Sequence, residues 1–297
     1  MNRPSAQNSI RLSNSTLNNI KLIVSDLDGT LLNDEGNISN ETQTLIKELM
    51  DSGIKFSFAT ARPHSAIINF AGLLDLRDPL ISLDGALIRS YPSNQNIFES
   101  YVPARHVRTA IEYADQYLLK IALCHVEAIY YTEHNSAIPQ MLDKFGSEFK
   151  EISSYDGYMN NVLEVVIAGE RNDSVKYIKN RMNFPYSFGI ESSYSKSHYH
   201  PGIYYTEIRK NGVSKATALD RLRKCMKIKI NETAVLGDWY NDRELFETKA
   251  IKIAVANAVP EIKRMADYIT RRTNNEGGVA EFLEMVLIAR KGINVFK

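Results

Sequence analysis

Two aspartates separated by one residue follow a short apolar segment near the start of the chain. Asp26 and Asp28 come directly after residues 21–25, which have the composition of a strand buried on both faces. Residues i and i+2 of an extended segment point the same way, so both carboxylates can serve one pocket. Two carboxylates held together repel each other, which favours a bound divalent cation or one raised pKa. A solvated acidic turn is the alternative interpretation, whereas a calcium loop is excluded because its sixth position is Leu31 and its twelfth is Asn37.

A second acidic cluster follows another predicted strand, residues 233–237. Gly237 permits a tight turn, and Asp238, Asn241 and Asp242 come within the next five residues. Together with the earlier pair, Asp238 would offer the oxygen ligands that Mg²⁺ prefers. Asp242 and Asn241 could orient those ligands by hydrogen bonds without binding the metal themselves. An acidic turn that caps a helix is the alternative interpretation.

Two further segments have the residue types of a phosphate site. Thr60, Ala61 and Arg62 close the second predicted strand, where a hydroxyl and backbone N–H groups can hold phosphate oxygens. Lys215 follows Ser214, a residue suited to cap a helix, so the lysine falls in the first helical turn. A single lysine in that position is ordinarily a solvated surface residue, and only the other three pieces make it a candidate.

The elements that must position these residues alternate between strand and helix at both ends of the chain. This alternation predicts an α/β core with a doubly wound parallel sheet, whose ligands bind beyond the carboxyl ends of the strands. The expected strands are 21–25, 55–60, 79–83, 233–237 and 251–256, and the expected helices are one capped by Ser39, 243–248, 260–266 and 279–289.

The middle of the chain has a different pattern and predicts an inserted α+β module. Helices are expected over 103–119 and 172–182, strands over 120–126, 163–168 and 204–209, and a Tyr/Ser-rich loop over 192–199. We therefore expect an N-terminal extension at 1–19, a core built from 20–85 and 206–297, and an inserted cap at 86–205. The extension, Ser/Asn-rich and without acidic residues through residue 18, is interpreted as disordered or loosely docked, with a transit peptide as the alternative.

Composition narrows the class of protein further. The chain has 36 Lys plus Arg against 35 Asp plus Glu, which argues against a dedicated nucleic-acid binder. Its two cysteines are too few for a disulfide framework or a thiolate metal site. No apolar run approaches the roughly 20 residues that cross a bilayer. A soluble protein of a reducing compartment is expected, cytoplasmic and without membrane or nucleic-acid partners.

The pieces together resemble the haloacid dehalogenase superfamily, and the length of the insertion resembles its Cof-like sugar-phosphate phosphatases with a large α/β cap. The resemblance covers about residues 20–290 and has the family's four motifs in the family's order. These motifs are Asp26-Leu27-Asp28-Gly29-Thr30-Leu31, Thr60, Lys215, and Gly237-Asp238 with Asn241-Asp242.

The resemblance implies a Mg²⁺-dependent phosphatase that acts on a small phosphorylated metabolite, as a monomer or homodimer. Asp26 would be the nucleophile that forms an aspartyl-phosphate, and Asp28 the acid and base. The implied metal-binding residues are Asp26, Asp28, Asp238 and Asp242, and the implied phosphate- or substrate-binding residues are Thr60, Ala61, Arg62, Lys215, Asp84 and Asn241. A phosphomutase of the same fold and a non-catalytic phosphometabolite-binding or regulatory protein are the alternatives.

Three residues depart from the pattern of this subgroup. Ala61 and Ala216 replace glycines, and Asp84 stands where asparagine is usual, near the junction with the cap. We expect the Asp84 carboxylate to accept hydrogen bonds from sugar hydroxyls and to repel a second phosphate. Trp239, inside the second acidic cluster, is expected to pack against the following helix, with a place in the wall of the pocket as the alternative.

Overall fold

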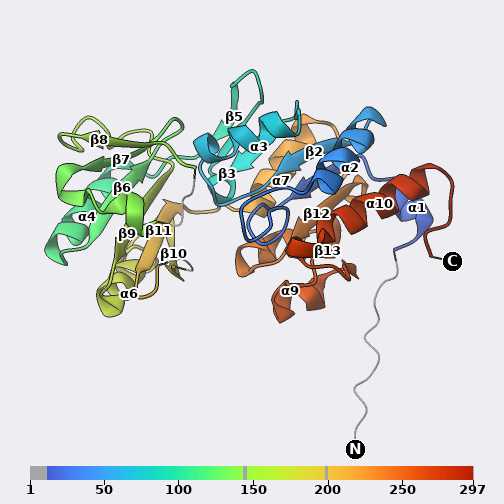
Figure 1. The fold of residues 1–297 in the computed structure, drawn as a ribbon. Helices are drawn as coiled ribbons and strands as arrows, with labels where there is room; N and C mark the ends of the chain where they lie inside the picture. Colours follow the sequence, from blue (N-terminus) through green and yellow to red (C-terminus); the bar gives the residue numbers. More distant parts are fainter. Residues whose placement is uncertain (1–11, 143–145, 198–199, 297) are drawn as a thin grey trace, which may run out of the picture. The chain divides into compact units, whose positions relative to one another are not determined.

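The computed structural model describes residues 12–142, 146–197 and 200–296, which form two compact units (Figure 1). Unit 1 comprises Met1–Thr60, Leu74–Asp78 and Leu219–Lys297, and unit 2 comprises Ala61–Leu73 and Pro79–Ala218. The expected division into a core and a cap at residues 86–205 stays a prediction. Within the described residues, no helix is long and apolar enough to cross a membrane.

Unit 1 is built on a five-stranded sheet with the order β14-β13-β12-β1-β2, in which every pair is parallel. This confirms the expected parallel α/β core. Its central strands are almost wholly apolar because helices cover both faces. The strands are β1 (Leu22–Ser25), β2 (Lys55–Phe58), β12 (Thr233–Gly237), β13 (Ile251–Ala254) and β14 (Tyr268–Ile269).

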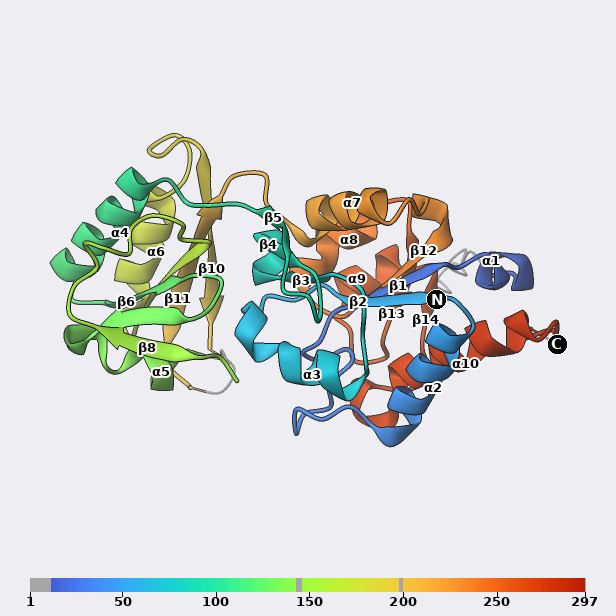
Figure 2. The same ribbon diagram turned by 90° about the horizontal axis from the view of Figure 1, so that it is seen from above.

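The helices of unit 1 lie on both faces of the sheet, with α2 and α10 on one face and α8 on the other (Figure 2). Ser39 begins α2 as expected, since its side chain accepts a hydrogen bond from the Thr42 N–H at 3.2 Å. The helices are α1 (Asn14–Asn18), α2 (Asn40–Asp51), α8 (Arg243–Glu247), α9 (Pro260–Met265) and α10 (Gly278–Arg290). The part of α7 (Lys215–Cys225) from Leu219 onward also belongs to unit 1.

The end of the N-terminal extension is docked onto unit 1, so the expectation of a disordered or loose segment is wrong from residue 12 onward. Leu17 of α1 is fully buried, and α1 packs against α10. The Asn14 side chain donates a hydrogen bond to the Ile293 carbonyl at 2.7 Å. The apolar residues of this segment bury surface that compensates for ordering it. Residues 1–11 of the extension lie outside the described residues.

The expected third strand of the parallel sheet belongs to another sheet. β3 (Leu80–Ser82) pairs antiparallel with β4 (Leu87–Arg89), which pairs with β5 (Asn96–Glu99) in a three-stranded sheet of unit 2. A short apolar run has the same composition in either kind of sheet. The sharp turn at Leu83–Gly85 reverses the chain and determines the antiparallel pairing.

Unit 2 also contains a six-stranded mixed sheet with the order β10-β11-β9-β6-β7-β8, which confirms an α+β module in the middle of the chain. Alternate residues of β9 face opposite sides. Val165 and Ile167 pack under α4 and α6, whereas Val166 and Ala168 contribute to a cluster with Leu83. The remaining elements are α3 (Ile68–Leu73), α4 (Ala104–Gln116), β6 (Lys120–Cys124), β7 (Ile129–Thr132), α5 (Ile138–Met141), β8 (Phe149–Ile152), β9 (Glu164–Gly169), α6 (Asn172–Arg181), β10 (Ile190–Lys196) and β11 (Tyr204–Lys210).

The segment expected as a Tyr/Ser-rich loop over 192–199 is mainly a strand. β10 pairs antiparallel with β11 from Ile190 to Lys196, and residues 198–199 lie outside the described residues. Serine has a low strand propensity, but pairing with a neighbouring strand overrides local propensity. Here the tertiary partner, not the local sequence, determines the structure.

Candidate active site

Three buried aspartates meet at the carboxyl edge of the parallel sheet. Asp26 follows β1 and Asp238 follows β12, and these strands are neighbours in register, with Ser25 opposite Leu236. One carboxylate oxygen from each of Asp26, Asp238 and Asp242 lies within 4.8 Å of the others. All three residues are buried, at 4%, 6% and 0% exposure. Such a set of hard oxygen donors suits Mg²⁺, because a cation offsets the repulsion between the carboxylates.

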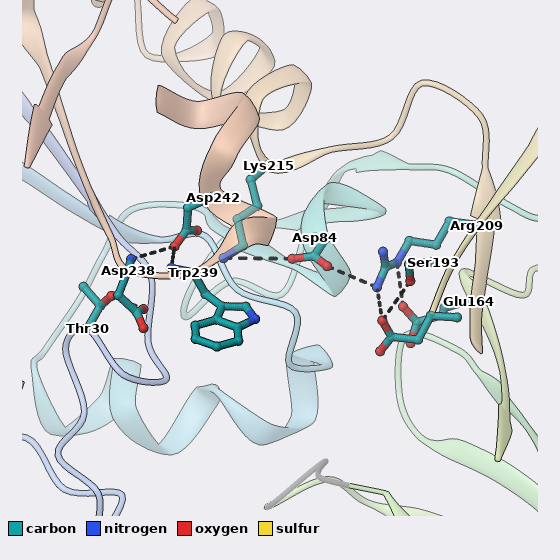
Figure 3. A network of polar contacts seen from close by, with 10 residues as sticks. Thr30, Asp84, Glu164, Ser193, Arg209, Lys215, Asp238, Trp239 and Asp242 are labelled. Carbon is teal, nitrogen blue, oxygen red and sulfur yellow. Dashed lines mark hydrogen bonds and ion pairs between the residues drawn. The ribbon is translucent and has the colours of Figure 1, made fainter. Parts of the chain in front are cut away.

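Hydrogen bonds within the loop after β12 fix this arrangement (Figure 3). One Asp242 oxygen, Oδ2, accepts from the backbone N–H of Asp238 at 2.9 Å and from that of Trp239 at 3.3 Å. The Thr30 hydroxyl donates to Oδ1 of Asp238 at 2.7 Å. Asp242 therefore shapes the loop that carries Asp238, and Thr30 joins the two motif loops.

Gly29 lets the loop after β1 approach Asp238. Its backbone is left-handed, with φ +76°, and a Cβ atom added there would lie 2.5 Å from Oδ2 of Asp238. Both the conformation and the space therefore require glycine. No other residue type could turn the chain here without moving a candidate metal ligand.

Gly29→Ala is expected to destabilise the protein by about 2 kcal/mol or more, because a left-handed alanine is strained and its methyl group displaces Asp238. Denaturant unfolding measures this change. Gly36→Ala is the matched control, since Gly36 has φ +77° but no neighbour within 4 Å of an added Cβ. Equal losses for the two variants would show that the approach to Asp238 contributes nothing.

The other sequence-predicted residues of unit 1 differ in burial. Thr60 is buried two residues after the end of β2, whereas Asp28 and Asn241 are exposed. The group of three carboxylates contains Asp26, Asp238 and Asp242, and the Asp28 carboxylate is not among them. Trp239 is 43% exposed, and its ring lies edge-on to that of Tyr240 with the centroids 5.3 Å apart, so its packing against the following helix stays a prediction.

Ala61, Arg62, Asp84 and Lys215 belong to unit 2. The Arg62 guanidinium lies over the ring of Phe70, 5.5 Å from its centroid, and its backbone carbonyl accepts a hydrogen bond from Leu83 N–H at 3.0 Å. Arg62 therefore packs beside the turn that carries Asp84.

Lys215 is the first residue of α7, as expected. The Thr217 N–H donates to the Ser214 hydroxyl at 3.3 Å, and the Thr217 hydroxyl accepts from the Ser214 N–H at 3.0 Å, so the two residues cap the helix reciprocally. The side chain of Lys215 is fully buried, and its Nζ lies 4.0 Å from Oδ1 of Asp84. This lysine is therefore not the solvated surface residue of the alternative interpretation.

Asp84 lies in a strained turn and forms an ion pair. Leu83 and Asp84 both have φ +48°, and Gly85 follows with φ +103°. A Cβ atom on Gly85 would lie 2.4 Å from the Ser214 carbonyl oxygen, so this turn fits closely against the start of α7. Oδ2 of Asp84 lies 3.1 Å from Nη2 of Arg209.

The structure adds three residues that the sequence interpretation did not include: Glu164, Glu207 and Arg209. Glu164 is fully buried at the start of β9, and Arg209 and Glu207 lie on β11. A glutamate beginning the apolar run 164–169 and an arginine ending a strand were detectable signals, because unpaired buried charges are rare.

An open parallel sheet binds its ligands beyond the carboxyl ends of its strands, and here that edge gathers carboxylates suited to a hard cation. Residues 23–283 match the family model of haloacid dehalogenase-like hydrolases. The chain belongs to this family.

Relatives of known sequence or structure cover nearly the whole chain. It is 26% identical to a 5-amino-6-(5-phospho-D-ribitylamino)uracil phosphatase of Bacillus subtilis, over 89% of this chain and 96% of the relative. It is also 26% identical to another Bacillus subtilis phosphatase, over 90% and 100%. A haloacid dehalogenase-like hydrolase from Bacteroides thetaiotaomicron superposes with a TM-score of 0.80 at 26% identity, over 90% of this chain and 99% of that chain.

Proposed function

We propose that this protein is a Mg²⁺-dependent phosphatase that hydrolyses a small phosphorylated metabolite through an aspartyl-phosphate. The observation that carries the proposal is the convergence of Asp26, Asp238 and Asp242 at the carboxyl edge of the parallel sheet. The names of its relatives support the same reaction class. The chain has two cysteines, Cys124 and Cys225, too few for a disulfide framework, which supports a reducing, cytoplasmic compartment.

In the proposed reaction, a carboxylate oxygen of Asp26 attacks phosphorus as the bond to the leaving oxygen breaks. Asp28 supplies the proton that the leaving oxygen takes up. Asp28 then accepts a proton from water, which attacks phosphorus and releases inorganic phosphate and the free Asp26 carboxylate. The exposure of Asp28 is compatible with an acid that exchanges protons with solvent.

Charge is the main obstacle to this reaction, because an anionic nucleophile must approach an anionic phosphate. Mg²⁺, held by Asp26 and Asp238 and supported by Asp242, would supply positive charge and orient a phosphate oxygen. Lys215, Thr60 and the backbone N–H groups of residues 61 and 62 would hold the other oxygens. Enzymes accelerate phosphate-monoester hydrolysis by up to ~10²¹, so several groups must contribute together.

Phosphate release from a panel of phosphomonoesters, with Mg²⁺ and with EDTA, tests the proposal. The panel includes sugar phosphates, flavin mononucleotide, pyridoxal phosphate, nucleotides and a phosphorylated ribitylaminouracil. We expect Mg²⁺-dependent release from at least one compound. Transfer of phosphate to a second position of the substrate would indicate a phosphomutase, and binding without turnover would indicate a non-catalytic protein; either result contradicts the proposal.

A further inference from the structure

Five charged side chains form a continuous network in unit 2, which begins at Lys215 and ends at Glu164 (Figure 3). Arg209 is at its centre: its Nε lies 2.6 Å from Oε2 of Glu164, and its Nη2 lies 3.1 Å from Oδ2 of Asp84 and 3.1 Å from Oε2 of Glu207. The other oxygen of Asp84 lies 4.0 Å from Nζ of Lys215. Asp84 therefore faces a different cation with each carboxylate oxygen.

Burial gives these contacts their importance. The exposed fractions of the side chains are 0% for Lys215 and Glu164, 11% for Arg209 and Glu207, and 12% for Asp84. Burial lowers the pKa of Arg209, but attraction to Glu164, Asp84 and Glu207 outweighs this effect and raises it above the ordinary value. The planar guanidinium presents two edges at once, which a lysine at the same place could not do.

The backbone holds the Asp84 carboxylate in place. Leu83, Asp84 and Gly85 are consecutive left-handed residues, and Gly85 fits against the Ser214 carbonyl immediately before Lys215. Strained backbone persists where the surroundings fix it, and it is concentrated at functional sites. Asp84 is thus fixed by the turn on one side and by Arg209 on the other.

The two ion-pair distances at Asp84 differ in length. Oδ2 lies 3.1 Å from Nη2 of Arg209, whereas Oδ1 lies 4.0 Å from Nζ of Lys215, so the pair with Arg209 is the closer one. Arg209 therefore draws the carboxylate toward β11. Without Arg209, Asp84 would be drawn toward the buried ammonium group of Lys215.

We propose that Asp84 and Arg209 are positioning residues for Lys215: Asp84 compensates the buried ammonium charge, and Arg209 keeps Asp84 from pairing so tightly that it competes with a substrate phosphate. This inference rests on the proposed phosphatase function. Arg209 acts through Asp84, so the effect of removing Arg209 depends on whether Asp84 is still charged.

Because of that dependence, a second substitution at Asp84 should partly restore the phosphate binding that is lost without Arg209. Loss of packing alone would not produce such a recovery. Arg209→Met is expected to raise KM for para-nitrophenyl phosphate and the inhibition constant of orthovanadate at least tenfold. The reason is that the Asp84 carboxylate then pairs with the Lys215 ammonium group and competes with the phosphate or vanadate for it. Adding Asp84→Asn removes the competing carboxylate, so the double variant is expected to recover at least fivefold of that loss. Arg209→Lys, which keeps the charge, should show a smaller increase in KM than Arg209→Met.

The experiment measures kcat, KM and vanadate inhibition at saturating Mg²⁺, together with the thermal shift caused by inorganic phosphate. Arg108→Met is the matched control, since Arg108 is exposed on α4 of the same unit, and its KM should equal that of the wild type. Unchanged KM and inhibition constant in both Arg209 variants would overturn the inference, as would a double variant no better than Arg209→Met.

The phosphate thermal shift separates this inference from the proposed function. If the wild type binds phosphate but hydrolyses no phosphomonoester, the phosphatase proposal fails, and the inference still requires a smaller shift in Arg209→Met and a recovered shift in the double variant. Equal phosphate shifts in all variants, or none in the wild type, would overturn the inference. Cooperative unfolding of each variant shows that the comparison concerns folded protein.

Discussion

Asp26→Asn is expected to reduce phosphate release by about 10³-fold or more, because an amide cannot replace the carboxylate as nucleophile. Asp26 is buried after β1, and its backbone N–H donates to the Leu236 carbonyl at 3.0 Å, a bond that the substitution retains. The change removes one negative charge from a cluster of three carboxylates and keeps the side chain's shape. Steady-state phosphate release with Mg²⁺ measures the effect.

The matched control for this prediction is Asp51→Asn, the same chemical change at an exposed position at the end of α2. It should retain full activity and stability. Thermal unfolding should show that Asp26→Asn is folded, with a midpoint at or above that of the metal-free wild type, since one repulsive charge is gone. An Asp26→Asn protein with wild-type turnover would exclude the aspartyl-phosphate route.

Removing the divalent metal is expected to abolish turnover and to lower the unfolding temperature. Three buried carboxylates within 4.8 Å repel each other without a cation, and Mg²⁺ at about 100 times its Kd stabilises the folded state by about 2.7 kcal/mol. For a protein of this size, that corresponds to a shift of roughly 5 °C. Scanning calorimetry in EDTA and in Mg²⁺ measures the shift.

Asp238→Asn tests which residues produce that metal effect. The substitution keeps an oxygen that can accept the Thr30 hydroxyl but removes the charge, so Mg²⁺ affinity should fall at least about 100-fold. The control is Asp267→Asn, which changes a partly buried carboxylate of unit 1 paired with Lys252 and should leave the Mg²⁺ shift intact. A full Mg²⁺ shift in Asp238→Asn would place the metal elsewhere.

The parallel core could be predicted from sequence because its signals are local. An apolar run, a capping serine and a glycine-terminated strand fix β1, α2 and β12 without reference to distant residues. β10 and β3 could not be assigned in this way. Their pairing is determined by partners far along the chain, and their composition also fits a loop or a parallel strand.

The residues of the candidate site also differ in whether local sequence or distant partners determine their surroundings. Asp26, Asp238 and Asp242 follow predicted strands, so their convergence could be foreseen from the geometry of a parallel sheet. The environment of Asp84 could not, because Arg209 lies 125 positions later in the sequence, on a different strand. The expected role of Asp84 toward sugar hydroxyls stays a prediction, and its ion pairs give it a second role.

Docking of α1 on α10 brings the two ends of the described chain together within unit 1. Asn14 bonds to the carbonyl of Ile293, and its side-chain oxygen accepts from the Val295 N–H at 3.0 Å. Domains with adjacent ends tolerate circular permutation, since a short linker replaces contacts that already exist. The chain could thus be closed between residues 12 and 296 and reopened elsewhere.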